Sequence, residues 1–178
     1  MVWLISDLHF DHENIIRYCN RPFANAEEMN RVLLENWNST ILVGDEVYFL
    51  GDMSFGRGSR PPSFWLGKLN GKVYFVKGNH DREKIAMKQS EFLEYSGRKF
   101  LLIHDPANKP VNWEGWTIHG HVHNHDLEKY PFINGEKKTI NVSAELVGYK
   151  PVSLEFICNL PLNRVKYMET ATSKSVSW

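Results

Sequence analysis

The sequence predicts an α/β fold in which buried strands end at polar residues that can carry chemistry. Four segments rich in β-branched and aromatic residues have the length and composition of buried strands: residues 2–5, 47–50, 73–76 and 100–103. Each is followed within a few residues by aspartate, asparagine or histidine. Ligands of α/β folds bind at such strand ends, so we expect these polar residues to share one site.

Helices are predicted between the strands. The first is expected to run from Asp11 or His12 to Tyr18, and the second begins after Asn25, which forms a capping box with Glu28. Apolar residues then recur at helical spacing: Met29, Val32, Leu33 and Trp37.

Later segments predict shorter elements. A short helix is expected over 64–69, and another from Asp81 through Met87. Further strands are expected near 116–118 and 139–142. Ser153 is the expected cap of a last helix.

Size and composition indicate one ordinary domain spanning residues 1–178. The chain has a mass of 20.7 kDa and 42% apolar residues, enough for a substantial core. Twenty-one basic residues balance 21 acidic ones, so no extended nucleic-acid surface is expected. The balance of charges does not exclude a local basic patch.

The chain is expected to be cytoplasmic. Its apolar runs are too short for a signal peptide or a membrane span, so no membrane partner is expected. Cys19 and Cys158 lie far apart without metal-binding spacing, and we interpret them as buried free thiols.

Five clusters of residues that bind metals follow one another along the chain. Carboxylates, imidazoles and an amide oxygen are the mixed ligands that a pair of divalent cations needs, and such a pair can clamp a phosphoryl group. Two cations carry more positive charge than two carboxylates neutralise, and this surplus suits a phosphate ester. The clusters are Asp7-Leu8-His9, Gly51-Asp52, Gly78-Asn79-His80-Asp81, His104, and Gly120-His121-Val122-His123.

Together, in this order, the clusters resemble the motifs of the calcineurin-like metallophosphoesterase superfamily, in particular its small single-domain bacterial and phage members. The resemblance implies a four-layer α-β-β-α sandwich of two mostly β sheets flanked by helices. It also implies two divalent metal ions that share Asp52. We expect Mn²⁺, with Fe, Zn²⁺, Ni²⁺ and Co²⁺ as alternatives. One ion would be held by Asp7, His9, Asp52 and His123, and the other by Asp52, Asn79, His104 and His121.

The same resemblance implies a hydrolase in which a hydroxide bridging the metals attacks the phosphorus. His80 is the expected general acid, because it follows Asn79 and is not needed as a ligand. Asp81 is expected to hold the His80 ring and raise its pKa. Asn79 is also a candidate for substrate contact.

Other residues are candidates with open alternatives. His12 and Arg17 follow the first cluster and could contact a phosphate or nucleotide; a helix-capping His12 and a surface Arg17 are the alternatives. His119 and His125 alternate with the two ligand histidines, which on a strand would place all four on one face. We expect these two in supporting or surface roles. The basic, glycine-rich segment 57–60 either borders the site or is a solvated loop.

A small phosphodiester or nucleotide is the expected substrate. Protein phosphatases of the superfamily carry an Asp-Arg pair after the second motif, where this chain has Met53-Ser54-Phe55, and an arginine before the third, where it has Lys77. DNA-repair nucleases of the superfamily usually carry an added DNA-binding region. A phosphomonoesterase acting on a small metabolite and a non-catalytic metal-binding scaffold are the alternatives.

Overall fold

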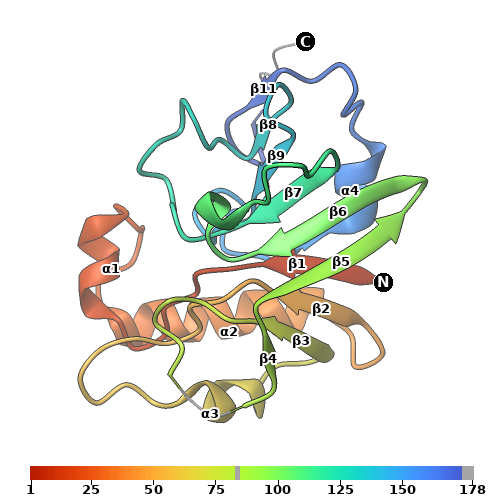
Figure 1. Cartoon of the computed structure of the whole chain (residues 1–178). Coiled ribbons are helices and arrows are strands. Elements are labelled where there is room, and N and C mark those ends of the chain that lie inside the picture. Colours follow the sequence, from red (N-terminus) through yellow and green to blue (C-terminus); the bar gives the residue numbers. More distant parts are fainter. Residues whose placement is uncertain (83–84, 174–178) are drawn as a thin grey trace.

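The computed structural model describes residues 1–82 and 85–173 and contains two β sheets with helices around them (Figure 1). Four strands of the first sheet are parallel, and β10 pairs antiparallel with β1 at one edge. The order of this sheet is β10 (Val152–Ser153), β1 (Val2–Ile5), β2 (Glu46–Phe49), β3 (Lys72–Val76) and β4 (Met87–Lys88).

The register of the parallel strands brings their ends together. Ile5 is paired with Phe49, and Phe49 with Phe75, so β1, β2 and β3 end in line. The chain therefore leaves all three strands at one edge of the sheet, and Asp7 and Asp52 follow within three residues of these ends. Parallel pairing thus places segments that are far apart in sequence next to one another.

Helix α2 (Ala26–Thr40) covers the first sheet as its apolar spacing predicts (Figure 1). Trp37 is 1% exposed, its ring lies 6.4 Å from that of Phe49 in β2, and its indole N–H donates to the carbonyl of Asn70. The Asn25 side chain accepts the Glu28 N–H at 2.9 Å, which confirms the predicted cap. The Glu28 carboxylate reaches the N–H of Ala24, one residue before the expected partner.

The second sheet is mixed. It is joined to the first through Ser6, which forms a parallel bridge with Ser143, its N–H donating to the carbonyl of Val142 at 3.0 Å. The two sheets and their helices confirm the predicted fold class. The order of this sheet is β11 (Tyr167–Met168), β8 (Ile133–Asn134), β9 (Thr139–Asn141), β7 (Trp116–His119), β6 (Arg98–Ile103) and β5 (Ser90–Tyr95).

The remaining helices are short. Ser153 accepts the Phe156 N–H at 3.0 Å, which confirms it as the cap of the last helix. Within residues 1–82 and 85–173, no helix has the length and apolar character needed to cross a membrane. The short helices are α1 (Glu13–Tyr18), α3 (Pro62–Leu66), the 3-10 turn η1 (Pro106–Asn108) and α4 (Leu154–Asn159).

The prediction of a helix from Asp81 to Met87 is wrong, because the structure shows no helix at either end of this segment. Asp81 and Arg82 are in irregular backbone, and Met87 begins β4. Residues 83 and 84 lie outside the described part of the chain. Asp81 does not cap a helix, because its carboxylate accepts backbone N–H groups of neighbouring loops. The two cysteines are buried free thiols, as predicted.

Candidate metal centre

The seven predicted ligands converge on one site, and five of them have strained backbones. A φ near +60° is uncommon for a residue with a side chain and costs about 1–3 kcal/mol, so it persists only where the surrounding structure enforces it. Here it turns the side chains at the loops toward one point. The five φ values are 57° for Asp7, 51° for His9, 59° for Asp52, 70° for His121 and 48° for His123.

The first group of ligand atoms comprises Asp7 Oδ1, His9 Nε2 and His123 Nε2, which lie close enough together to hold a cation. Asp7 Oδ1 lies 3.9 Å from His123 Nε2, and His9 Nε2 lies 3.6 Å from Asp52 Oδ2. Within the described chain, Asp7 Oδ1 and His9 Nε2 are buried and have no hydrogen-bond partner. Buried polar atoms are rarely left unpaired, so a cation between them fits this group.

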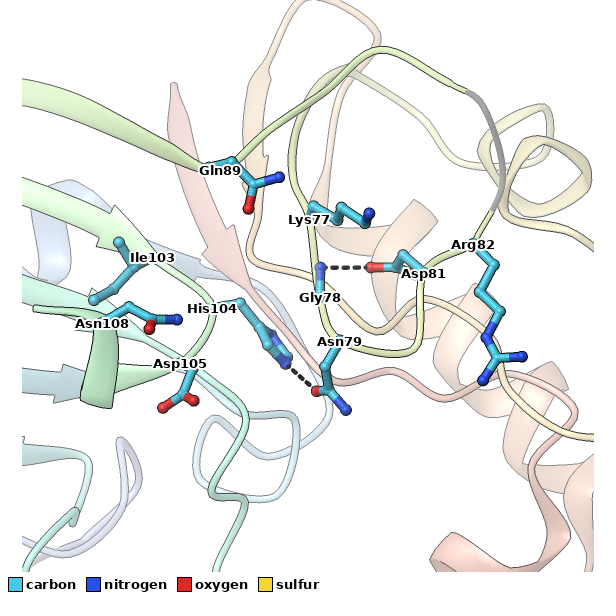
Figure 2. A pocket seen from close by; sticks show the side chains of 10 residues that line it. All are labelled: Lys77, Gly78, Asn79, Asp81, Arg82, Gln89, Ile103, His104, Asp105 and Asn108. Atoms are coloured by element: carbon cyan, nitrogen blue, oxygen red, sulfur yellow. Dashed lines mark hydrogen bonds between the residues drawn. The ribbon is translucent and has the colours of Figure 1, made fainter.

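The second group comprises Asn79, His104 and His121. Asn79 Oδ1 lies 2.9 Å from His104 Nε2 and 3.0 Å from His121 Nδ1, and the two ring nitrogens are 3.2 Å apart. Atoms that bind one cation at about 2.1 Å and roughly right angles lie about 3 Å from one another. The three atoms therefore have the spacing of ligands to a single ion. Figure 2 shows the His104 ring directed at Asn79.

Asp52 lies between the two groups. Its Oδ2 is 3.6 Å from His9 Nε2 of the first group and 3.4 Å from His104 Nε2 of the second. Its Oδ1 accepts the backbone N–H of His80 at 2.9 Å. One carboxylate oxygen therefore faces both ligand groups, which is the position that a bridging ligand requires.

The charges of the site favour cations. Burial opposes a charged His104 ring, but its contact with Asp52 and the charges of Asp7 and Asp52 outweigh burial and raise its pKa to about 9. Burial likewise opposes a charged His123, but the charge of Asp7 and contacts with Cys19 and Glu145 raise its pKa to about 11. A raised pKa favours a proton on each of these two rings, and a metal ion that binds the ring nitrogens would displace that proton.

Two glycines allow the loops to approach this closely. A Cβ added at Gly78 would collide with the Asp52 carboxylate, and one at Gly120 would collide with Ser6 and the Asp7 carboxylate. The close approach at Gly120 lets Asp7 Oδ2 accept hydrogen bonds from the Ser6 hydroxyl at 2.6 Å and from the His121 N–H at 3.0 Å.

Sequence reasoning missed Glu145 and the structural role of Arg21. The Glu145 side chain is 4% exposed, accepts from His123 Nδ1 at 3.1 Å and pairs with Arg21 at 2.7 Å. Arg21 also donates to the carbonyls of Asp7 and Leu8. The pair directs Nε2 of His123 at the site and holds the Asp7 loop in place. No motif signals this, because the two residues are 124 positions apart.

His80 lies beside the ligands. Its Nε2 is 4.0 Å from Asp52 Oδ2, its side chain is 33% exposed, and its ring centroid lies 4.1 Å from that of Phe55. The expected partnership with Asp81 needs correction. The Asp81 carboxylate accepts N–H groups of Asp52, Met53 and Gly78 at 2.7, 3.1 and 2.8 Å. It therefore holds two site loops together, and Figure 2 shows its carboxylate directed at the Gly78 N–H.

The residues expected to bind substrate fall in different places. His12 lines a cavity of about 530 Å³ over the ligands, together with His9, Asp52 and His80. His12 occupies the N-cap position of α1, but its side chain makes no capping hydrogen bond. Burial, followed by the charge of His80, lowers the pKa of His12 to about 4. Arg17 is exposed, does not line this cavity, and donates to the side chain of Asn14 at 2.7 Å.

Asn79 belongs to the second ligand group, and the alternating histidines have different environments. Asn79 lines a neighbouring cavity of about 550 Å³ and directs its oxygen into the second ligand group. The strand β7 ends at His119, so the four histidines from His119 to His125 do not share a strand face. His119 is fully buried and burial lowers its pKa to about 4, whereas His125 is exposed at the cavity rim.

A two-sheet α/β fold with converging aspartate and histidine ligands defines the metallophosphoesterase class of hydrolases. The chain belongs to the calcineurin-like phosphoesterase family, whose model matches residues 1–164. Family membership supports a metal-dependent phosphoesterase in general, and the buried Asp and His groups are compatible with divalent metals.

Individual relatives have related sequences. An uncharacterised protein of Methanocaldococcus jannaschii, MJ1445, is 49% identical over 163 residues, which cover 89% of this chain and 90% of that protein. The gene 66 protein of Mycobacterium phage L5 is 32% identical over 81 residues, covering 44% of this chain and 39% of that protein. The solved structure of AQ665 from Aquifex aeolicus, a protein of unknown function, is 28% identical with a TM-score of 0.66, covering 90% of this chain and 98% of that one.

Proposed function

We propose that the protein is a phosphodiesterase with two divalent metal ions that hydrolyses a small diester or nucleotide. The observation that carries this proposal is the position of Asp52 Oδ2, which faces a ligand group on either side. Two cations held there would supply Lewis acidity and an activated water. Mn²⁺ is our first expectation, since the mixed oxygen and imidazole ligands do not by themselves select one metal.

The protein's own residues position the substrate and move one proton. The scissile phosphate would lie in the cavity over the ligands, with His12 and His80 at its wall. His80 Nε2 would donate a proton to the oxygen of the leaving alcohol as the P–O bond breaks. Water adds at phosphorus, so a diester and water give a monoester and an alcohol. Asp81 and Glu145 hold the loops and the His123 ring that build this geometry.

The proposal favours diesters over monoesters because the site opens into a cavity on each of two sides. One cavity contains Asn79 and His104, and the other contains His12 and His80. A diester carries a substituent on both sides of phosphorus, whereas a monoester carries one. The absence of the residues that mark protein phosphatases in the superfamily also favours a small substrate.

The test compares bis-p-nitrophenyl phosphate with p-nitrophenyl phosphate, using protein reconstituted with Mn²⁺. We expect higher kcat/KM for the diester, loss of activity on chelation and recovery when Mn²⁺ is returned. Preference for the monoester would instead support a phosphomonoesterase. Binding of two Mn²⁺ without hydrolysis of either ester would support a scaffold.

His80→Ala tests the general acid. We expect kcat to fall about 10²- to 10⁴-fold on a substrate with an alcohol leaving group, with metal content unchanged. The loss should be smaller on bis-p-nitrophenyl phosphate, because p-nitrophenolate leaves without needing a proton. Equal losses on both substrates, or loss of metal, would contradict an acid role.

A further inference from the structure

A third cavity adjoins the metal centre on the side of the proposed general acid. It has a volume of about 750 Å³, within the range of small-molecule sites, and we call it the leaving-group pocket. It shares His12, Asn14, Phe55 and His80 with the cavity over the ligands. The two cavities are therefore continuous through these side chains.

The position of His80 determines which part of a substrate enters this pocket. His80 Nε2 lies 4.0 Å from Asp52 Oδ2 on one side, and its ring packs against Phe55 on the other. A general acid must lie within hydrogen-bond reach of the oxygen that it protonates. The group attached to that oxygen is the leaving group, so it extends from His80 into the leaving-group pocket.

The described lining of this pocket is positively charged. Arg57 and Arg82 line it, and none of its lining residues that the structure describes is an aspartate or a glutamate. Some other arginines are neutralised, as Arg21 is by Glu145 and Arg60 by Asp11. Within residues 1–82 and 85–173, no carboxylate forms an ion pair with Arg57 or Arg82. Two guanidinium groups without an ion pair in the described part of a chain of zero net charge suit an anionic ligand.

The apolar wall of the pocket is held in place. Phe55, Pro61 and Pro62 supply it. The Phe55 N–H donates to the Phe10 carbonyl at 3.2 Å, and Phe55 packs edge-on against His12 with ring centroids 4.8 Å apart.

The loop that carries this wall is anchored at its far end. Arg60 donates its backbone N–H and its Nε to the Asp11 carboxylate at 2.9 and 3.0 Å, and its guanidinium lies 4.4 Å from the Trp65 ring centroid. The Ser54 hydroxyl donates to the Arg60 carbonyl at 2.8 Å. The pocket is therefore preorganised, which lowers the cost of binding a ligand.

We propose that the leaving group is itself a nucleotide: a nucleoside whose ring contacts the apolar wall and whose own phosphate pairs with Arg57 and Arg82. This inference rests on the proposed phosphodiesterase function and specifies its substrate as a linear phosphodiester with a phosphorylated leaving group. Hydrolysis of the 5′-phosphorylated diadenylate pApA illustrates the reaction. Water adds to the linking phosphorus, the bond to the 3′-oxygen breaks, that oxygen takes a proton from His80, and two molecules of 5′-AMP result.

The test compares pApA with ApA, which lacks only the 5′-phosphate on the leaving nucleoside. We expect the Mn²⁺-reconstituted protein to cleave pApA with kcat/KM about 10- to 100-fold above that for ApA, the range for a charge-assisted hydrogen bond. Arg57→Gln and Arg82→Gln should each reduce this ratio, mainly through KM for pApA, and should lower kcat/KM for bis-p-nitrophenyl phosphate less, because that ester has no phosphate on its leaving group. Arg31→Gln is the matched control, because Arg31 is exposed and pairs with Glu35 on α2.

The outcomes separate the two proposals. Equal kcat/KM for pApA and ApA, or a ratio that neither arginine variant changes, would overturn the nucleotide leaving group while diesterase activity persists. Absence of bis-p-nitrophenyl phosphate hydrolysis by the reconstituted wild type would overturn the function on which this inference rests. Phe55→Leu gives a second check, since it should weaken pApA and ApA alike by removing ring contact.

Discussion

Replacing Glu145 by glutamine tests whether a buried ion pair supports the metal centre. The substitution keeps the size of the side chain and removes its charge. Arg21 would then be a buried cation without its carboxylate partner, and His123 Nδ1 would lose a charged acceptor. We expect two separate effects, one on folding and one on metal binding.

The effect on folding follows from the pKa of Glu145. Although burial opposes the charged form, the charge of Arg21 and the contacts with His123 outweigh it and lower the pKa from 4.5 to about 2. That difference corresponds to about 3 kcal/mol of folding free energy. Because the folded-state pKa is depressed, this contribution is complete above pH 4.5 and is lost as the pH falls toward 2. Breaking a buried pair typically costs about 3–5 kcal/mol, which agrees in size.

The effect on metal binding follows from the orientation of His123. Replacing a residue that orients a metal-binding histidine typically lowers metal affinity about 10- to 100-fold. We expect a loss of this size for the ion bound by Asp7, His9 and His123, with the second ligand group less affected. Within the described residues, no hydrogen bond or ion pair joins its members Asn79, His104 and His121 to Glu145, whose partners are Arg21 and His123.

The assays keep the two effects apart. Urea unfolding of metal-free protein between pH 2 and pH 7 gives the free energy of unfolding at each pH. Titration calorimetry with Mn²⁺ at neutral pH gives the metal affinity. Glu155→Gln is the control, because Glu155 is exposed on α4 and none of the seven ligands lies on that helix. Reduced stability with unchanged Mn²⁺ affinity would refute the orienting role of Glu145. Unchanged stability would refute the assignment of a structural ion pair.

Two further predictions concern packing. Gly120→Ala should abolish or strongly weaken Mn²⁺ binding, because its Cβ would collide with the Asp7 carboxylate; Gly44→Ala is the control, since a Cβ there meets nothing within 4 Å, and similar Mn²⁺ titrations for both variants would contradict this. Trp37→Ala should lower the free energy of unfolding by about 3–5 kcal/mol in urea, because Trp37 is 1% exposed between α2 and β2. Its folded fraction should still bind Mn²⁺ as the wild type does, and a selective loss of metal would show that α2 has a role beyond packing.

Local patterns were sufficient where the responsible interactions are local. The apolar runs at 2–5 and 47–50 became strands, and Asn25 and Ser153 became helix caps, because a strand needs a short run of suitable residues and a cap needs one side chain three residues away. The helix expected after Asp81 failed because the same residue type serves equally well as an acceptor for distant backbone N–H groups. The sequence has no signal that distinguishes the two uses.

The sequence by itself determined the order along the chain in which polar residues follow successive strands. Through family resemblance it named the seven candidate ligands from Asp7 to His123. Only the tertiary structure decided that Asp52 faces both groups, that Glu145 and Arg21 support them from a distance of 124 positions, and that Arg17 lies outside the cavity. The physical reason is that parallel pairing of β1, β2 and β3 sets which loops meet. Burial then makes each charged group there depend on partners that no local pattern records.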